Sequence, residues 1–222
     1  MTDSATLLWE IREELHPVEQ AIRNHSYVEA VEAGRVRRER FRFFCGEQFH
    51  IIGSDLRSAA LLVNRSRTQR AREFFLKILQ GESAAWDALR PLARAFGVDE
   101  PQLQAYEPMP AAHTYAAYMA WLASYATSTE VAAAFLVNFA AWGANCGRLS
   151  RAFQAHYGLR ASEVAFLDLF ATTPPGFEEE AVRVLEEGMA RGVEPRAIKR
   201  AARLLQGYER LFWDALWEVS QH

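Results

Sequence analysis

The sequence predicts an all-α protein, and three features of its 222 residues indicate that class. Apolar residues recur at spacings of three and four along almost the whole chain, which is the period of one helix face, while β-branched alternation is scarce. Helix signals punctuate this pattern, with Asp3 or Ser4 as a first cap and Gly192 followed by Pro195 near the end. No repeat or linker divides the chain. We therefore expect a single domain over residues 1–222, built as a two-layer helical bundle.

The first helix is expected at 4–24, with His16 and Pro17 either inside it or at a break. Further helices are expected near 38–63, 67–80, 83–96, 112–127, 130–156, 161–172, 176–191 and 196–219. Two irregular stretches separate some of them, the loop 97–110 and the proline-rich break 172–176. Glycine after one helix and proline in the first turn of the next suit the last connection.

Composition excludes several classes of function. The net charge is −3, so no overall field attracts nucleic acid or an anionic membrane, and the arginine-rich run 34–42 is interpreted as a solvated helix start. No apolar run reaches the ~18 residues of a membrane span, and the first residues lack the pattern of a signal peptide. With Cys45 and Cys146 as the two cysteines, we expect reduced, buried thiols in a cytoplasmic protein.

Polar residues on apolar stripes are the candidates for a functional site, because burying them costs free energy that something must compensate. In FFCGEQFHII (43–52), Glu47 and His50 lie three apart on one face, and E-x-x-H is also half of a common metal site. Glu209 is the one charge in an apolar stripe of the last helix. A buried carboxyl group of this kind has a raised pKa and suits acid–base chemistry, although a structural ion pair explains it equally well.

The helix expected at 130–156 carries a further group of candidates. Asn138 and Trp142 lie one turn apart, as do Gly143 and Gly147. Two glycines at this spacing allow either close helix packing or the approach of a flat ligand. Both interpretations stay open from the sequence.

Five segments occur in the order found in one known group of proteins. They are LHPVEQAI, EAGRVRRERFRFFCGEQFHIIGSDLRSAAL, TYAAYMAWL (114–122), FLDLFATTPPGFEEEAV (166–182) and YERLFWDAL (208–216). Together they cover nearly the whole chain and resemble the TenA/PqqC-type members of the heme-oxygenase-like superfamily. The resemblance implies the multi-helix bundle of that superfamily in a single domain.

In the thiaminase II branch of this family, the pocket holds an aminopyrimidine among an acid, several tyrosines, a nucleophilic cysteine and a glutamate on the last helix. The resemblance matches the acid to Glu47 and the terminal glutamate to Glu209. It places His50 where an aromatic residue is usual and matches Tyr118 to a pocket aromatic. These residues would then face one another across a cavity.

The same comparison shows what this chain lacks. The cysteine falls on Asn138, and two further tyrosines fall on Trp142 and Phe170, so the usual nucleophile is absent. Hydrolysis by two carboxyl groups remains open, with Glu47 positioning or activating water and Glu209 protonating the leaving amine.

The di-iron oxidase branch offers another comparison, because its first ligands resemble the pair Glu47 and His50. Its later ligands fall on Phe170, Pro174 and Phe177, and none of these side chains binds iron. The resemblance therefore implies no complete di-iron site, and we expect no bound metal.

The heme-binding and PqqC branches each match only part of this pattern. For heme binding, His16 corresponds to a proximal ligand and Gly143 and Gly147 to a kinked distal helix, but Ala144 replaces the acid that follows the first glycine. The PqqC branch oxidises a quinone precursor with basic residues, whereas this chain has the acid Glu47. We expect no cofactor, and a neutral or cationic heterocycle as ligand.

The sequence therefore favours a TenA-like pocket enzyme that hydrolyses a flat nitrogen heterocycle in thiamine-related salvage without a cysteine nucleophile. The catalytic residues are expected to be Glu47 and Glu209, and the substrate-binding residues His50, Tyr118, Asn138, Trp142 and Phe170. Two alternatives stay open, a non-catalytic ligand-binding member of the fold and an oxidoreductase of the PqqC or di-iron kind. From the resemblance we also expect a homodimer or homotetramer.

Overall fold

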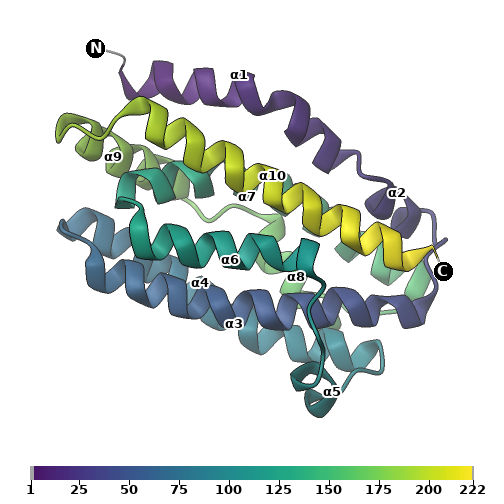
Figure 1. Ribbon diagram of the computed structural model, residues 1–222. Helices are drawn as coiled ribbons and strands as arrows, with labels where there is room; N and C mark the ends of the chain where they lie inside the picture. The colour runs from purple at the N-terminus through teal and green to yellow at the C-terminus, as the bar shows by residue number, and fades with distance from the viewer. Residues whose placement is uncertain (1–2, 222) are drawn as a thin grey trace.

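The computed structural model describes residues 3–221, and each regular element within them is a helix (Figure 1). This confirms the all-α class. The elements are α1 (Ser4–Arg23), α2 (Ser26–Glu32), η1 (Arg38–Arg40), α3 (Phe41–Arg65), α4 (Gln69–Ala95), α5 (Glu100–Gln104), α6 (Pro110–Tyr125), α7 (Ser128–Tyr157), η2 (Ala161–Glu163), α8 (Ala165–Ala171), α9 (Phe177–Ala190) and α10 (Pro195–Ser220).

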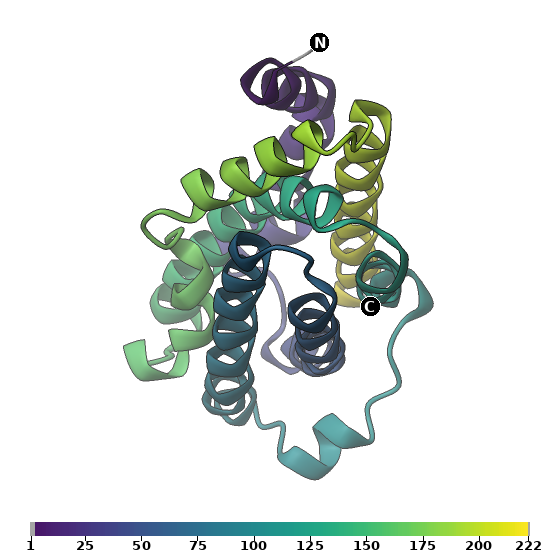
Figure 2. The ribbon, with the colours of Figure 1, turned by 90° about the vertical axis from the view of Figure 1, so that its left-hand side faces the viewer.

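The long helices form one bundle. α3 packs along α4 and α6, while α10 packs against α6, α7 and α1, and α7 also contacts α8 and α9 (Figure 1). The connection between α4 and α6, which contains α5, projects from one side of the bundle before the chain enters α6 (Figure 2). Within the described residues, none of the helices combines the length and the apolar character needed to cross a bilayer.

Local sequence explains where several helices begin and end. The carboxylate of Asp3 caps α1 by accepting a hydrogen bond of 2.7 Å from the backbone N–H of Thr6. A reciprocal capping box between Thr127 and Glu130 starts α7. After α9, Gly192 adopts a positive φ of 88°, and Pro195 occupies the first turn of α10, as the sequence indicated.

Three elements differ from the expectation. α4 is one continuous helix, where the sequence suggested two helices near 67–80 and 83–96, because its buried stripe keeps the same period across Gly81. A glycine inside a helix costs only about 1 kcal/mol relative to alanine, which packing outweighs. The short helices α2 and α5 were not expected, and α5 lies inside the expected loop 97–110. α1 continues through Pro17 without a break, which is one of the two arrangements that the sequence left open.

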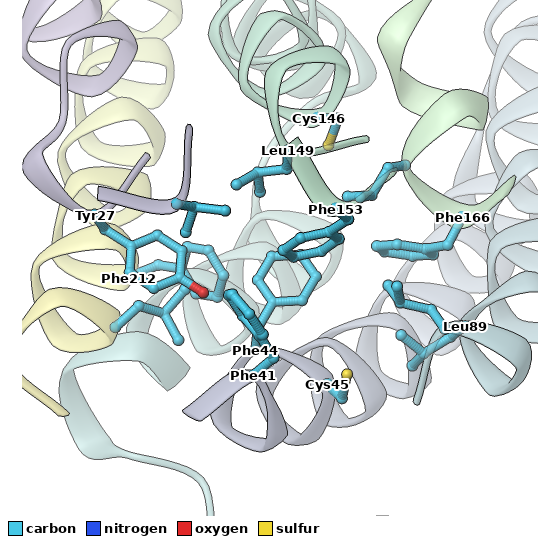
Figure 3. Close-up of a cluster of buried hydrophobic side chains, with 14 of the residues drawn as sticks. Tyr27, Phe41, Phe44, Cys45, Leu89, Cys146, Leu149, Phe153, Phe166 and Phe212 are labelled. Carbon is cyan, nitrogen blue, oxygen red and sulfur yellow. The ribbon is translucent and has the colours of Figure 1, made fainter. Parts of the chain in front are cut away.

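The core holds many aromatic side chains, and Figure 3 shows one cluster of them. Phe41 and Phe153 meet edge to face with ring centroids 4.7 Å apart. Cys45 and Cys146 lie buried in the same cluster as free thiols, as the sequence indicated (Figure 3). Burial raises the pKa of Cys45 to about 12 and the pKa of Cys146 well above its ordinary value. Both are therefore protonated and poor nucleophiles at neutral pH.

Candidate active site

A cavity lies in the middle of the bundle, where α3, α4, α6, α7, α8 and α10 meet. About 450 Å³ of empty space, part of it open to solvent, lies among its lining atoms. The lining residues are Gln48, Ile51, Ile52, Asp55, Glu82, Tyr115, Asn138, Phe139, Trp142, Phe170, Glu209 and Phe212. The cavity therefore combines three carboxyl groups with aromatic walls, and none of the described residues that line it is Lys or Arg.

Glu209 of α10 is the centre of a buried hydrogen-bond network. Its side chain is 2% exposed and accepts hydrogen bonds from Trp213 Nε1, at 3.1 Å, and from the Asn138 amide. The Asn138 amide also donates to Gln206 Oε1 at 3.2 Å and accepts from the Tyr115 hydroxyl at 3.3 Å. Burial raises the pKa of Glu209 to about 8, although its hydrogen bonds oppose that shift. A carboxyl group in this state can donate a proton at neutral pH.

Asp55 of α3 and Glu82 of α4 form a second acidic group in the same cavity. They are 7% and 8% exposed, and within residues 3–221 neither has an ion-pair partner. Burial raises the pKa of Glu82 to about 7, and burial together with the charge of Glu82 raises the pKa of Asp55 well above its ordinary value. Tyr115 lies within the field of all three acids, which adds to the effect of burial in raising its own pKa.

These raised pKa values make the stability of the fold depend on pH. A buried acid with a raised pKa stabilises the fold fully below its unfolded-state pKa and loses that contribution as pH rises through the folded-state pKa. For Glu209 these limits are 4.5 and about 8, and for Glu82 they are 4.5 and about 7. We expect the free energy of unfolding, measured with urea, to fall as pH rises from about 5 to about 8.

The variant Glu209→Gln tests the contribution of this carboxyl group to that pH dependence. The amide cannot ionise, so the variant is expected to lose less stability than the wild type on the alkaline side, by roughly 1–4 kcal/mol. Identical slopes of unfolding free energy against pH in the two proteins would contradict this assignment.

Glu47 and His50 lie outside the cavity, on the neighbouring face of α3. Glu47 Oε1 accepts hydrogen bonds from the Tyr106 hydroxyl, at 2.8 Å, and from the Met109 backbone N–H, at 2.7 Å. His50 Nε2 lies 2.9 Å from the carbonyl oxygen of Tyr106. The Tyr106 ring covers Gly46 so closely that a Cβ there would lie 2.4 Å from it. These residues fasten the connection between α4 and α6 onto α3, so the expected arrangement of Glu47 opposite Glu209 does not occur.

The remaining expected residues fall into two groups. Asn138, Trp142 and Phe170 line the cavity with Glu209, and the Trp142 and Phe170 rings meet with centroids 5.8 Å apart. Tyr118 is not among the cavity residues; its ring contacts Trp121 and Tyr208, at 5.7 and 5.1 Å between centroids. Tyr115, three residues earlier on α6, lines the cavity in its place.

Sequence reasoning missed four polar cavity residues, Gln48, Asp55, Glu82 and Tyr115. A signal was present for Glu82, because it is the one charge among the buried residues of α4, which otherwise are apolar. Dividing α4 into two helices placed Glu82 near a helix start, where a glutamate is ordinary. Asp55 lies less than one turn beyond the stretch 43–52, on the face of the helix that begins with Gln48.

The donor residues do not fit a metal centre. No group of three His, Cys, Asp or Glu side chains in residues 3–221 is arranged to hold a metal ion. Phe170 and Pro174 stand at two positions of the di-iron ligand set, and His16 lies on an exposed face of α1. Gly143 packs against the backbone of α8, since a Cβ there would lie 2.5 Å from the Phe170 carbonyl oxygen.

Fold and cavity together define the class of protein as an all-α bundle with an acidic, aromatic-walled cavity between its helices. Residues 12–219 match the sequence model of the TENA/THI-4/PQQC family. The chain therefore belongs to this family, which confirms the resemblance seen in the sequence.

Solved structures agree with this assignment. A TenA homolog from Pseudomonas syringae pv. tomato superimposes with a TM-score of 0.82 at 13% identity, covering 98% of this chain and 96% of that chain. A domain with a heme oxygenase-like fold from Shewanella denitrificans gives a TM-score of 0.75 at 14% identity, covering 100% of this chain and 94% of that chain. These matches show the heme-oxygenase-like fold that the sequence predicted.

One curated relative has a name that describes an activity. The protein named aminopyrimidine aminohydrolase from Halalkalibacterium halodurans is 25% identical over 125 residues, which is 56% of each chain. The chain thus matches about half of the length of that relative.

Proposed function

We propose that this protein is a hydrolase that replaces an amino group of a flat nitrogen heterocycle, of the aminopyrimidine type, by a hydroxyl group in thiamine-related salvage. The observation that carries the proposal is the convergence of Asp55, Glu82 and Glu209 on one cavity walled by aromatic rings. The activity in the name of the Halalkalibacterium halodurans relative supports it.

The chemistry of the cavity matches such a ligand. An aminopyrimidine presents a ring nitrogen that accepts a hydrogen bond beside an amino group that donates one, and a protonated carboxyl group complements both. Glu209 has this form at neutral pH because its pKa is raised to about 8. Trp142, Phe139 and Phe170 supply flat surfaces for stacking. Acidic lining disfavours an anionic substrate.

The reaction needs water as nucleophile. Asn138 stands at the position matched to the family's cysteine, and an amide side chain forms no covalent intermediate of that kind. Water therefore adds to the ring carbon that carries the amino group, and the C–N bond then breaks. Ammonia leaves with a proton donated by Glu209, and the ring keeps the hydroxyl oxygen. Asn138 holds Glu209 in place through the hydrogen bond between their side chains.

The test is ammonia release by the purified protein from a panel of aminopyrimidines, with the corresponding hydroxypyrimidines as blanks. The matched control is Glu130→Gln, because Glu130 is a buried carboxyl group outside the cavity and glutamine preserves its capping box. We expect release from at least one aminopyrimidine and equal turnover by the control. The proposal is refuted if the protein releases ammonia from none of the aminopyrimidines in the panel.

A second candidate function is ligand binding without turnover. It is favoured by one observation, the amide of Asn138 at the position where the family's nucleophile is expected. Calorimetric titration separates the two, because saturable binding of an aminopyrimidine with no ammonia release supports the binding function.

A further inference from the structure

We propose that Asp55 and Glu82 act as one carboxyl pair, sharing a single proton, and form the base that activates the attacking water. The inference rests on the hydrolytic function proposed above and goes beyond it by assigning the base. In this arrangement the base comes from α3 and α4, while the acid, Glu209, comes from α10. The family's cysteine is then replaced by a water molecule and a base elsewhere in the cavity.

The placement of the two carboxyl groups supports this assignment. α3 and α4 pack along each other for much of their length, and Asp55 and Glu82 line the same cavity from these two helices. Both side chains are more than nine-tenths buried. Asp55 Oδ1 is buried and has no hydrogen-bond partner in the described part of the chain. A buried acceptor of this kind calls for a ligand or a water molecule to satisfy it.

The pair holds one proton near neutral pH because two neighbouring buried carboxylates cannot both ionise cheaply. Burial raises the pKa of Glu82 to about 7, and the charge of Glu82 adds to burial in raising the pKa of Asp55. Between a pH of about 7 and about 8, the pair therefore carries about one negative charge while Glu209 keeps its proton. A base and an acid are then present together in one cavity.

Other titratable groups surround both ends of the cavity. Near the pair, Tyr115 faces it from α6, and the ion pair of Lys77 and Glu180 lies on the groove that reaches Glu82, with N and O 2.5 Å apart. Tyr115, with its raised pKa, stays neutral in this pH range, and Glu180 is held in its ion pair with Lys77. Neither supplies an alternative base.

Around Glu209, the titratable neighbours are Glu19 and Arg23 of α1, Tyr115 of α6 and Cys146 of α7. Arg23 and Glu19 form an ion pair with each other, at 2.8 Å. Cys146 stays protonated because burial raises its pKa well above the ordinary value. Glu209 is thus left as the acid on this side of the cavity.

Glu82 also connects the pair to the outside. A groove with about 920 Å³ between its lining atoms lies where α4, α8 and α9 meet, and it includes the proline-rich segment 172–176. Glu82, Phe139 and Phe170 line both this groove and the cavity. Glu82 lines the groove and Asp55 does not, so water that enters along the groove meets Glu82 before Asp55, which suits a group that must accept its proton.

The proton and electron balance of the step is complete. The ionised carboxylate of the pair takes a proton from water while the water oxygen bonds to the ring carbon. The C–N bond breaks, its electron pair stays on nitrogen, and Glu209 gives that nitrogen a proton. The products are ammonia and the hydroxypyrimidine. Solvent in the groove then carries a proton from the pair, and Glu209 is reprotonated, so no oxidant or further reactant is needed.

The experiment compares Asp55→Asn and Glu82→Gln with the wild type, using an aminopyrimidine that the wild type converts. We expect kcat to fall by about 10²–10⁴-fold in each variant, with KM changed by less than about threefold. The control is Glu180→Gln, which alters the groove and leaves the cavity intact, so its kcat should match the wild type.

A pH profile distinguishes a base from a structural role. The base must be ionised and the acid protonated, so kcat/KM of the wild type should rise through a pH of about 7 and fall through about 8. The acidic limb should move or disappear in Glu82→Gln. If an amide variant fails to fold, the pH profile of the wild type alone tests the inference. The absence of an acidic limb between a pH of about 6 and about 8 would overturn it.

The outcomes separate the two proposals. If the wild type releases ammonia and both amide variants keep its kcat and its acidic limb, the pair is not the base, while the hydrolytic function stands. If the wild type converts no aminopyrimidine, the hydrolytic function is refuted, and the assignment of the pair as its base is refuted as well.

Discussion

Replacing Glu209 by glutamine is expected to lower kcat for ammonia release by about 10²–10⁴-fold, with a much smaller change in KM. Glutamine has the same shape and can still accept a hydrogen bond from Trp213 Nε1. Substrate binding is therefore largely kept. The amide cannot transfer a proton to the departing nitrogen, so the loss falls on the chemical step. Steady-state kinetics of ammonia release measure both parameters.

The same substitution elsewhere provides the control for this result. Glu130→Gln also changes a buried glutamate to its amide, but in the first turn of α7 and outside the cavity. Its kcat should equal that of the wild type. A Glu209→Gln enzyme with kcat within about threefold of the wild type would show that the leaving amine receives its proton from another group.

Gly143→Ala is expected to have the second large effect, on both stability and ligand binding. A Cβ at position 143 would lie 2.5 Å from the carbonyl oxygen of Phe170, which is backbone and cannot move alone. α8 must therefore shift away from α7, and Phe170 shifts with it out of the cavity wall. Overpacking of this kind costs about 1–3 kcal/mol of unfolding free energy. Urea denaturation and calorimetric binding of an aminopyrimidine measure the two effects.

Gly147 is the matched control, one turn further along the same helix. A Cβ there would lie 3.5 Å from the Ala171 Cβ, which is an ordinary contact. Gly147→Ala should be neutral or stabilising by about 1 kcal/mol, because alanine favours the helix. Equal stability of the two variants would mean that α8 is free to move and that Gly143 has no special role.

The helical fold was predictable because its signals are local and repeated. Asp3 caps the start of α1 and Gly192 follows the end of α9, as these local signals predicted. The differences arise where tertiary packing outweighs propensity. At Gly81, for example, the buried stripe on either side keeps α4 helical through its middle. The five residues of α5 were too short for a periodic pattern to reveal.

The site was less predictable, and α3 shows why. Each step along a helix turns the side chain by about 100°, so an error of one residue selects a different face. The sequence favoured the face of Glu47 and His50, while the cavity is lined by Gln48, Ile51 and Asp55. Both faces of α3 are buried, one by the bundle and one by the connection with Tyr106 and Met109. Periodicity alone does not distinguish the buried face that lines the cavity from the buried face that packs against the connection.

The two buried thiols bear on how the protein withstands chemical damage. Alkylating reagents and peroxide attack thiolates, and Cys45 and Cys146 are protonated and enclosed in the core. The hydrolase proposed above works through carboxyl groups, so its activity should survive reagents that inactivate a cysteine-dependent hydrolase. Labelling of these thiols then requires the core to open, so its rate at a given temperature reports how often the native bundle unfolds.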